Sequence, residues 1–285
     1  MHSAREARKE TARELPYVEA ELNYLVPPDG PLWNYTYEPP AGQPRTNASY
    51  EARRVAIHDL RPIADELSLD RQGFALIAQE SAVGDFYDED ELRRVYYPET
   101  ERLVAKATGA RRVVVFDHTI RRRHPGASDR TAGLPRQPVT RIHNDYTLKS
   151  GPQRVRDLMG AEATALLGRR FAVINVWRPI RGPLHDAPLA VCDAATIEGD
   201  DFVPVEQRYR DRTGEISYVI YDPAHRWYYA PAMRAAEALL IKCYDSATDG
   251  RARFVAHSAF EDPTMPADAL PRESIELRTL VFDPV

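Results

Sequence analysis

The sequence predicts a mainly β protein with helices, in which a double-stranded β-helix, or jelly roll, forms the core and helices flank it. Two observations predict this class. From residue 111 onward, short apolar runs alternate with clusters of glycine, proline and aspartate, as in strands joined by turns. Eight such runs are present, which suits a jelly roll. The chain has 285 residues, 43% of them hydrophobic, so we expect one domain over residues 1–285.

The first part of the chain, residues 1–50, is expected to form an N-terminal arm. Residues 3–14 are charged and contain alanine, which predicts a short surface helix. Residues 16–44 carry prolines and aromatic residues, which favour an extended segment. We expect this segment to wrap around the body of the protein.

Residues 51–110 are expected to support the core with strands and a helix. The letters ARRVAIHDLRP and RQGFALIAQES give two strand-like runs. A helix follows, with Asp88 as its N-cap, Glu91 three positions on as in a capping box, and Gly109 at its end. Pro98 lies inside this pattern and is expected to split or kink the helix.

The jelly-roll core, which carries the metal site discussed below, is expected over residues 111–285. Its eight strand-like runs are residues 112–120, 138–143, 170–180, 188–197, 215–222, 238–245, 253–260 and 274–282. Between Tyr146 and Arg169, helical spacing predicts an insertion that covers the sheet. In the cupin-like form of this architecture, two packed sheets hold a ligand site at their mouth.

The charge and hydropathy of the chain argue against nucleic acid and membrane as binding partners. Acidic residues outnumber basic ones, 43 against 38, for a net charge of −5, which argues against a nucleic-acid surface or a polybasic membrane anchor. No apolar run approaches the ~20 residues that cross a bilayer, and the charged start does not resemble a signal peptide. We therefore expect a cytoplasmic protein with a small-molecule substrate. The oligomeric state stays open, with a homodimer as one option.

The triplet His143-Asn144-Asp145, followed far downstream by His257, predicts an iron site. Residues at i and i+2 of an extended segment share a face, so His143 and Asp145 can bind one metal ion together. His257 would complete two histidines and one carboxylate, the ligand set that leaves open positions in non-haem Fe(II) oxygenases. Alone, His-x-Asp is a weak signal, and each residue singly fits an ordinary structural role. Their combination is what favours the metal site.

An arginine adds specificity to this pattern. Arg272 opens the last long strand, and its planar guanidinium suits the distal carboxylate of 2-oxoglutarate. Ser274 lies two residues on, on the same face, and could add a hydroxyl donor. Arg278 also shares this face, so either arginine could be the main anchor. Glu276, between them, is the competing ion-pair partner.

Three other histidines and the two cysteines are alternative metal ligands. Among histidines, His225 is the strongest rival ligand, although it lies beside a proline turn. His185 and His118 each adjoin an aspartate without a spacer, so the paired side chains would point to opposite faces. Zinc is disfavoured because Cys192 and Cys243 lie far apart in sequence.

Several residues near the site could contact the co-substrate or the substrate. Asn175 and Trp177 share one face of a central strand, and Asn175 is a candidate co-substrate contact. Trp177, Tyr146, His225 and Tyr228 are candidates for the substrate wall. For the aromatic residues, packing in the core is an equally good explanation.

The sequence blocks together resemble a known family. RIHNDYT, INVWRPIRGPL, PLAVCDA, YDPAHRWYYAPAM, LLIKCYDS, HSAFEDP and PRESIELRTLVF occur in the order found in non-haem iron, 2-oxoglutarate-dependent hydroxylases and desaturases, across roughly residues 110–285. That group includes fungal gibberellin desaturase-like proteins and a cephem methoxylase component. The resemblance implies Fe(II) bound by His143, Asp145 and His257, with Arg272 as the 2-oxoglutarate clamp.

The resemblance also implies the reaction. Fe(II), 2-oxoglutarate and dioxygen would together oxidise a small-molecule secondary metabolite by hydroxylation, desaturation or cyclisation. Asp145 speaks against a halogenase, a class that leaves the carboxylate position for a halide. Two alternatives remain: a non-catalytic helper subunit of the same fold in a two-component enzyme, and an iron oxidase that does not use 2-oxoglutarate.

Overall fold

Two β-sheets dominate the computed structural model, which describes residues 14–127 and 133–285. The nine-stranded sheet runs in the order β1 (Tyr17–Leu25), β3 (Tyr50–Asp59), β11 (Trp227–Tyr229), β8 (Leu189–Cys192), β13 (His257–Ala259), β6 (His143–Asn144), β10 (Thr213–Val219), β9 (Phe202–Arg208), β2 (Leu32–Tyr35). The five-stranded sheet runs β4 (Phe74–Ala78), β12 (Glu237–Asp245), β7 (Phe171–Pro179), β14 (Glu273–Phe282), β5 (Arg112–Arg122). Neighbouring strands are antiparallel except β11 with β3 and β2 with β9. The jelly-roll prediction is confirmed.

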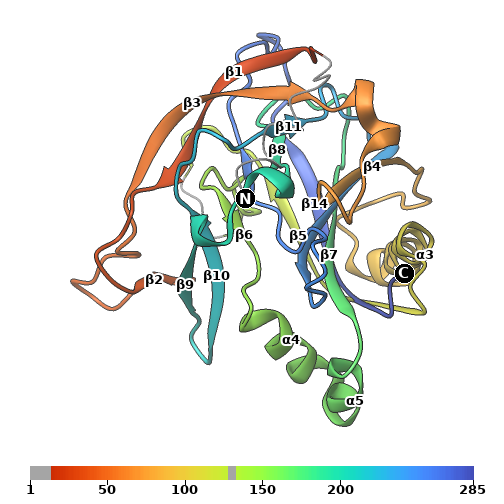
Figure 1. Ribbon diagram of the computed structural model, residues 1–285. Coiled ribbons are helices and arrows are strands. Elements are labelled where there is room, and N and C mark those ends of the chain that lie inside the picture. Colours follow the sequence, from red (N-terminus) through yellow and green to blue (C-terminus); the bar gives the residue numbers. More distant parts are fainter. Residues whose placement is uncertain (1–13, 128–132) are drawn as a thin grey trace, which may run out of the picture.

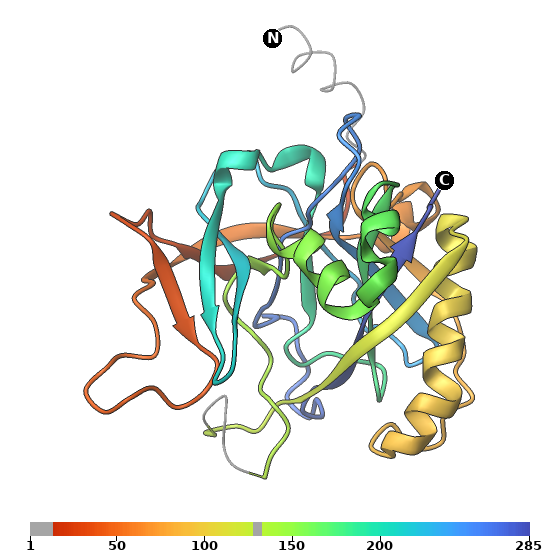
Figure 2. The ribbon, with the colours of Figure 1, turned by 90° about the horizontal axis from the view of Figure 1, so that it is seen from below.

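The helices lie outside the two sheets. They are α2 (Glu89–Glu91), the π-helical η3 (Leu92–Tyr96), α3 (Tyr97–Thr108), α4 (Ser150–Met159) and α5 (Ala163–Leu167), with short 3₁₀ turns η2 (Arg61–Glu66), η4 (Gly160–Glu162), η5 (Ala194–Thr196) and η6 (Gly199–Asp201). Figures 1 and 2 show α3 along the outside of the five-stranded sheet, and α4 and α5 on another side of the molecule. The helical insertion expected between residues 146 and 169 is α4 to α5.

The main core lies between the sheets. Phe171, Val173 and Trp177 of β7 pack in one buried cluster with Leu189 and Val191 of β8. The alternate residues of β7, at positions 172, 174 and 176, are also buried, in a second cluster with α3. Because β7 is buried on both faces, apolar residues fill most of its positions without alternation.

The N-terminal segment contributes strands to the nine-stranded sheet. β1 pairs with β3 along nine residues, and β2 pairs with β9 at the opposite edge. Residues 17–25 and 32–35 are therefore built into the sheet. The surface helix predicted for residues 3–14 lies, up to residue 13, outside the described residues.

The helical segment begins as predicted but continues differently. Asp88 Oδ1 accepts hydrogen bonds from the backbone N–H groups of Asp90 and Glu91, so the N-cap is confirmed. The carboxylate of Glu91 binds the N–H groups of Gly84 and Asp85, so the predicted capping box is wrong. A π-helical stretch ends at residue 96, and the next residues start α3. Pro98 therefore lies in the first turn of α3, where its missing N–H costs little.

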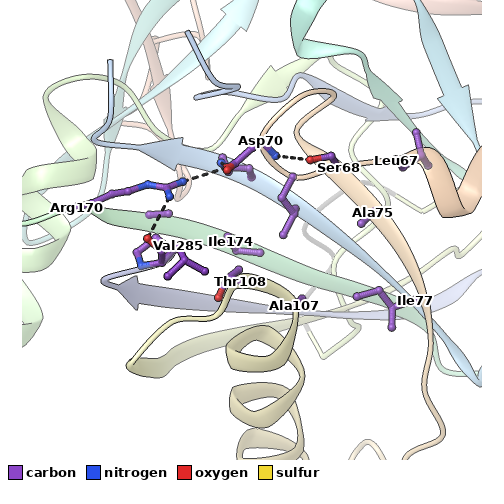
Figure 3. Close-up of a pocket in the computed structure, with 14 residues that line it drawn as sticks. Leu67, Ser68, Asp70, Ala75, Ile77, Ala107, Thr108, Arg170, Ile174 and Val285 are labelled. Atoms are coloured by element: carbon purple, nitrogen blue, oxygen red, sulfur yellow. Dashed lines mark hydrogen bonds and ion pairs between the residues drawn. The ribbon is translucent and has the colours of Figure 1, made fainter. Parts of the chain in front are cut away.

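A cavity of about 300 Å³ lies on the outer side of the five-stranded sheet (Figure 3). Apolar residues such as Ile77, Ala107 and Ile174 line it, and Asp70 and Arg170 form an ion pair at its edge. The cavity therefore offers a ligand both apolar and polar surface. None of the three residues of the predicted iron site lines it.

Beside this cavity, a buried carboxylate binds two cations. Asp245 is fully buried, 2.7 Å from Arg170 Nη2 and 2.8 Å from Lys242 Nζ. Asp245→Asn is expected to lower the free energy of unfolding by about 3–5 kcal/mol, because it leaves buried cations underpaired. Urea denaturation measures this loss, and Glu19→Ala, at an exposed ion pair with Arg54, is the control with an expected loss below about 1 kcal/mol. Equal losses would contradict the prediction.

The same carboxylate gives this stabilisation a pH dependence. Burial alone would raise the pKa of Asp245, but Arg170 and Lys242 outweigh burial and lower it. A carboxyl whose folded-state pKa is lowered stabilises the fold above its unfolded pKa of about 3.9. We therefore expect this contribution to disappear as the pH falls through the lowered pKa.

Candidate metal centre

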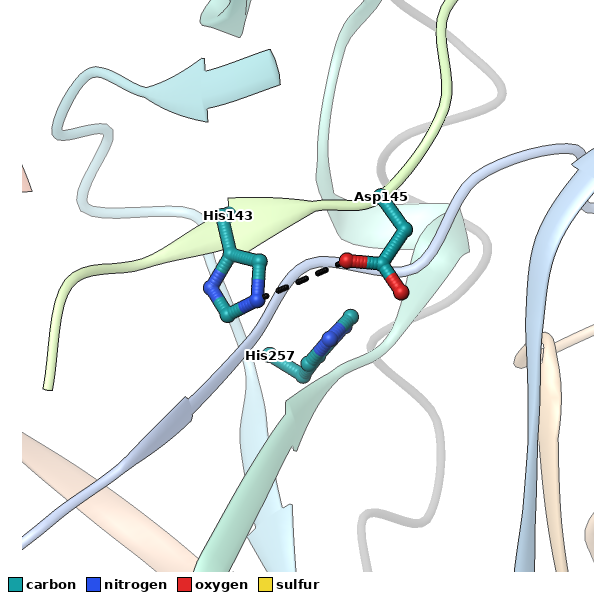
Figure 4. A group of neighbouring side chains, drawn as sticks. All are labelled: His143, Asp145 and His257. Atoms are coloured by element: carbon teal, nitrogen blue, oxygen red, sulfur yellow. Dashed lines mark ion pairs between the residues drawn. The ribbon is translucent and has the colours of Figure 1, made fainter. Parts of the chain in front are cut away.

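Three side chains from two neighbouring strands converge at one point (Figure 4). In the register of the sheet, His257 on β13 lies directly opposite His143 on β6, and their rings are 4.4 Å apart between centroids. Asp145 follows β6, with Oδ1 3.7 Å from His143 Nε2. One candidate ligand atom from each residue lies within 4.8 Å of the other two. The predicted convergence of His143, Asp145 and His257 is therefore present in the fold.

Backbone carbonyls fix the orientation of both imidazoles. His143 Nδ1 lies 2.8 Å from the carbonyl oxygen of Arg141, and His257 Nδ1 lies 3.0 Å from that of Val255. Since a carbonyl oxygen only accepts hydrogen bonds, each Nδ1 must carry the proton and donate it. Each Nε2 then has a free lone pair, as a metal ligand requires. Burial and the neighbouring His257 also lower the pKa of His143 to about 3, so its ring stays neutral.

The carboxylate of Asp145 is held by two donors on the opposite sheet. Its Oδ2 accepts hydrogen bonds from Asn175 Nδ2, at 2.8 Å, and from Arg278 Nε, at 3.2 Å. Burial alone would raise the pKa of Asp145, but Arg278, the two histidines and Asn175 together lower it. Asp145 is therefore anionic, with Oδ1 directed toward His143.

Asn144 fixes the backbone between the two residues of the motif. Its side chain points away from the histidine pair and donates hydrogen bonds to the carbonyl groups of Tyr146 and Cys243. Cys243 belongs to β12, in the five-stranded sheet. Asn144 thereby joins the end of β6 to the opposite sheet, which fixes where Asp145 emerges.

The two candidate anchor arginines have different partners. Arg278 pairs with Asp145, Asp117 and Glu276, and these carboxylates outweigh burial and raise its pKa. Arg272 is 2% exposed, and its side chain has no carboxylate partner among the described residues. Arg278 is thus paired within the protein, whereas the side chain of Arg272 is buried without a counter-ion among the described residues.

Neutral groups hold the Arg272 guanidinium in place. Nε donates to Ser274 Oγ at 3.0 Å, Nη1 donates to the carbonyl of Ala187 at 2.7 Å, and the guanidinium carbon lies 4.9 Å from the ring centre of Trp177. Burial, together with the nearby Arg121, lowers the pKa of Arg272 to about 9. Such a group favours binding an anion, because a carboxylate would supply the missing counter-charge.

Comparisons with known proteins agree with this geometry. A family model described as "Oxidoreductase/YMDC permease-like domain" matches residues 22–282. The Fe(II)/2-oxoglutarate-dependent dioxygenase nvfI of Aspergillus novofumigatus is 34% identical over 277 residues, which cover 93% of this chain and 97% of nvfI. The chain belongs to the Fe(II)/2-oxoglutarate-dependent hydroxylase/desaturase family.

Two further matches extend the comparison. The hydroxylase/desaturase efuI of Hormonema carpetanum is 35% identical over 257 residues, covering 83% of this chain and 86% of efuI. The solved structure of the iron and alpha-ketoglutarate-dependent endoperoxidase NvfI matches with a TM-score of 0.85 and 31% identity, over 94% of this chain and 99% of that one.

Within residues 14–127 and 133–285, no helix is long and apolar enough to cross a membrane.

The other residues predicted for this oxygenase site differ in where they lie. Asn175 contacts Asp145 and so lies beside the metal centre, whereas Trp177 contacts Arg272. Tyr146 directly follows Asp145 and, like Tyr228, is buried in the main core. Tyr228 packs against Phe74, which supports the packing explanation for that residue.

The rival histidines lie in other environments. His225 stacks on Tyr24 and its Nε2 lies 3.2 Å from Asp201, so both ring nitrogens face partners outside the metal centre. His118 contacts Tyr97 on α3, whereas the adjacent Asp117 faces Arg278, as expected for neighbours in a strand. In the described part of the chain, His143, Asp145 and His257 are the side chains close enough together to hold a metal ion, as predicted.

Sequence reasoning did not identify the loop that holds Arg272. Asp186 Oδ2 accepts the backbone N–H of Arg272 at 2.8 Å, and Asp186 also pairs with Arg123. The next residue, Ala187, has a φ of 46°, a left-handed conformation that is strained for alanine and directs its carbonyl to the guanidinium. The sequence offers no signal for these contacts, because they join segments more than 80 residues apart.

Proposed function

We propose that this chain binds Fe(II) through His143 Nε2, His257 Nε2 and Asp145, uses 2-oxoglutarate and dioxygen, and oxidises a C–H bond of a small-molecule secondary metabolite. One observation carries the proposal: the three ligand atoms converge at one point, and Arg272, next to the start of β14 in the opposite sheet, is buried without a carboxylate partner for its side chain among the described residues. The family relationship supports the same chemistry.

The donor set fits ferrous iron. Two neutral imidazoles and one carboxylate leave coordination positions for a chelating co-substrate and dioxygen, as in the facial triad of non-haem iron oxygenases. Zinc sites more commonly use thiolates or a third histidine. Cys243 is buried in the core, its thiol facing the carbonyl of Ile241, so neither the geometry nor the ligand type favours zinc.

The protein's own groups would orient the reactants. When bound, iron supplies the activation of dioxygen that accompanies oxidative decarboxylation of 2-oxoglutarate. Arg272 would pair with the distal carboxylate of the co-substrate, while Ser274 and the face of Trp177 keep the guanidinium from rotating. Asn175 and Arg278 would hold Asp145 Oδ2, so that Oδ1 stays available to the metal.

An anaerobic titration tests this proposal. Fe(II) and then 2-oxoglutarate are added to the protein, and the weak visible charge-transfer band of the chelate is recorded. Saturation at one equivalent of iron is expected. In air, succinate should then form only with iron and 2-oxoglutarate present. Without the band or succinate, a helper subunit or a 2-oxoglutarate-independent oxidase would explain the fold instead.

The contact between Asp186 and Arg272 leads to a separate prediction. Asp186→Ala is expected to raise the Kd for 2-oxoglutarate by about 5- to 30-fold, since a buried N–H loses its acceptor and the arginine is displaced. Asp186→Asn, which keeps an acceptor oxygen, should recover most of the affinity. The same charge-transfer titration gives both values. Equal affinities in all three proteins would show that Asp186 has no positioning role.

A further inference from the structure

A second arginine on the inner face of the nine-stranded sheet has no place in the proposed reaction. Arg141 lies two residues before His143 in an extended segment, so both side chains share one face. Tyr218 of β10 is paired in register with His143 and shares that face too. The guanidinium carbon of Arg141 lies 5.9 Å from the ring centres of both Tyr50 and Tyr218. Arg141 therefore lies on the same face as His143 and packs against a pair of aromatic rings.

The backbone of this arginine is fixed by β1. Asn23 donates from its side-chain amide to the carbonyl of Thr140, and its own carbonyl accepts the N–H of Ile142. Ile142 is fully buried on the other face of the segment. These contacts set the direction in which Arg141 leaves the chain, so its position follows from the fold.

Arg141 and Tyr50 each have a buried polar atom without a hydrogen-bond partner among the described residues. Arg141 forms no ion pair with any described carboxylate, and its Nε is buried without a hydrogen-bond acceptor. The hydroxyl of Tyr50 is buried as well, and no hydrogen-bond partner meets it among the described residues. Arg141 Nε and the Tyr50 hydroxyl are two buried donors without an acceptor, which indicates a ligand that supplies the acceptor atoms.

The charges of the site restrict what that ligand can be. Arg278 is matched by three carboxylates, and Arg272 is assigned to 2-oxoglutarate. A further unpaired guanidinium close to the metal ligands is therefore left for another anion. We propose that Arg141, with the hydroxyl of Tyr50, binds a carboxylate group of the primary substrate. The inference rests on the proposed function, because it assigns the second ligand of the same site.

Arg154 on α4 provides a matched control. Its guanidinium lies over the ring of Phe116 at 5.6 Å, and its Nε is also buried without a partner. It carries the same charge, and it is close enough to Tyr146 to lower the pKa of that residue against the effect of burial. Arg154→Gln therefore removes one positive charge near the site without touching Arg141. It separates a long-range effect of charge from direct binding.

The experiment compares two probes of the same shape, one with a carboxylate and one with a neutral amide in its place. Equilibrium dialysis under anaerobic conditions, with Fe(II) and saturating 2-oxoglutarate so that Arg272 is occupied, measures the affinities for 4-phenylbutyrate and its neutral amide. The acid is expected to bind at least about tenfold more tightly. Arg141→Gln should abolish this preference, and Arg154→Gln should keep it. Arg141→Lys, which keeps the charge without the planar fork, should retain part of it.

Each other outcome would overturn the proposal. Equal binding of acid and amide by the unmodified protein would show that the site does not select a carboxylate. An unchanged preference in Arg141→Gln, or an equal loss in Arg154→Gln, would remove Arg141 as the contact. Failure of the proposed function looks different, since the charge-transfer band would then be missing, whereas failure of this inference leaves the band in place and removes only the preference that depends on Arg141.

Discussion

Replacing His257 with alanine is expected to abolish stoichiometric iron binding and, with it, iron-dependent succinate formation. Loss of an outer partner of a metal ligand already costs about 10- to 100-fold in metal affinity, so loss of the ligand itself should exceed about 100-fold. His143→Ala should have the same effect, because His143 supplies the second imidazole of the same group of three ligands. Iron content after gel filtration, measured with a chelating dye, gives the result.

The matched control for this variant is His225→Ala. His225 was the strongest rival ligand in the sequence, but its ring nitrogens face Tyr24 and Asp201. The control variant should keep its iron while losing some stability. If His257→Ala instead retained one iron per chain, the third ligand would have to be another residue, and the converging geometry would be irrelevant to metal binding.

The metal-binding motif could be predicted from the sequence because the alternation of side chains along a strand depends only on neighbouring residues. Strand alternation alone put His143 and Asp145 on one face, and it also put Arg272, Ser274 and Arg278 on one face. The long apolar runs that became β7 and β14 were recognisable because both are buried along nearly their whole length. Where burial dominates, periodicity and composition give the strand directly.

The strands that were missed have weaker local signals. β9 contains Pro204 and alternates with charged residues, and β11 has only three residues beside a proline turn. Both are strands because neighbours distant in sequence pair with them. Similarly, the predicted strand at residues 138–143 has only its last residue in β6, which is two residues long. Pairing of this kind depends on tertiary context.

The choice between the two arginines shows the same limit. In sequence, Arg272 and Arg278 are equivalent: both lie on the inner face of one strand near a serine or a glutamate. They differ in the carboxylates that other strands bring. Asp117 from β5 and Asp145 after β6 neutralise Arg278, whereas the loop at Ala187 offers Arg272 only a carbonyl. Only the assembled fold reveals which cation keeps an unmet charge.

That difference yields the second large prediction. Arg272→Gln is expected to raise the Kd for 2-oxoglutarate by about 30-fold or more, because truncating one partner of a buried, hydrogen-bonded charge pair costs 2–5 kcal/mol or more. Iron content should stay near one per chain, since Arg272 touches none of the three candidate ligands. The anaerobic charge-transfer titration gives the Kd, and the chelating dye gives the iron content.

Arg278→Gln is the matched comparison, and its effect should fall on the metal. Without Arg278, Asp145 loses one of its two donors, and Glu276 and Asp117 lose their cation, so iron affinity and stability should both fall. The opposite pattern, with 2-oxoglutarate affinity lost in Arg278→Gln and kept in Arg272→Gln, would transfer the anchor to Arg278. Turnover in Arg272→Gln without any co-substrate would favour the oxidase, because the cationic fork would then have no carboxylate to bind.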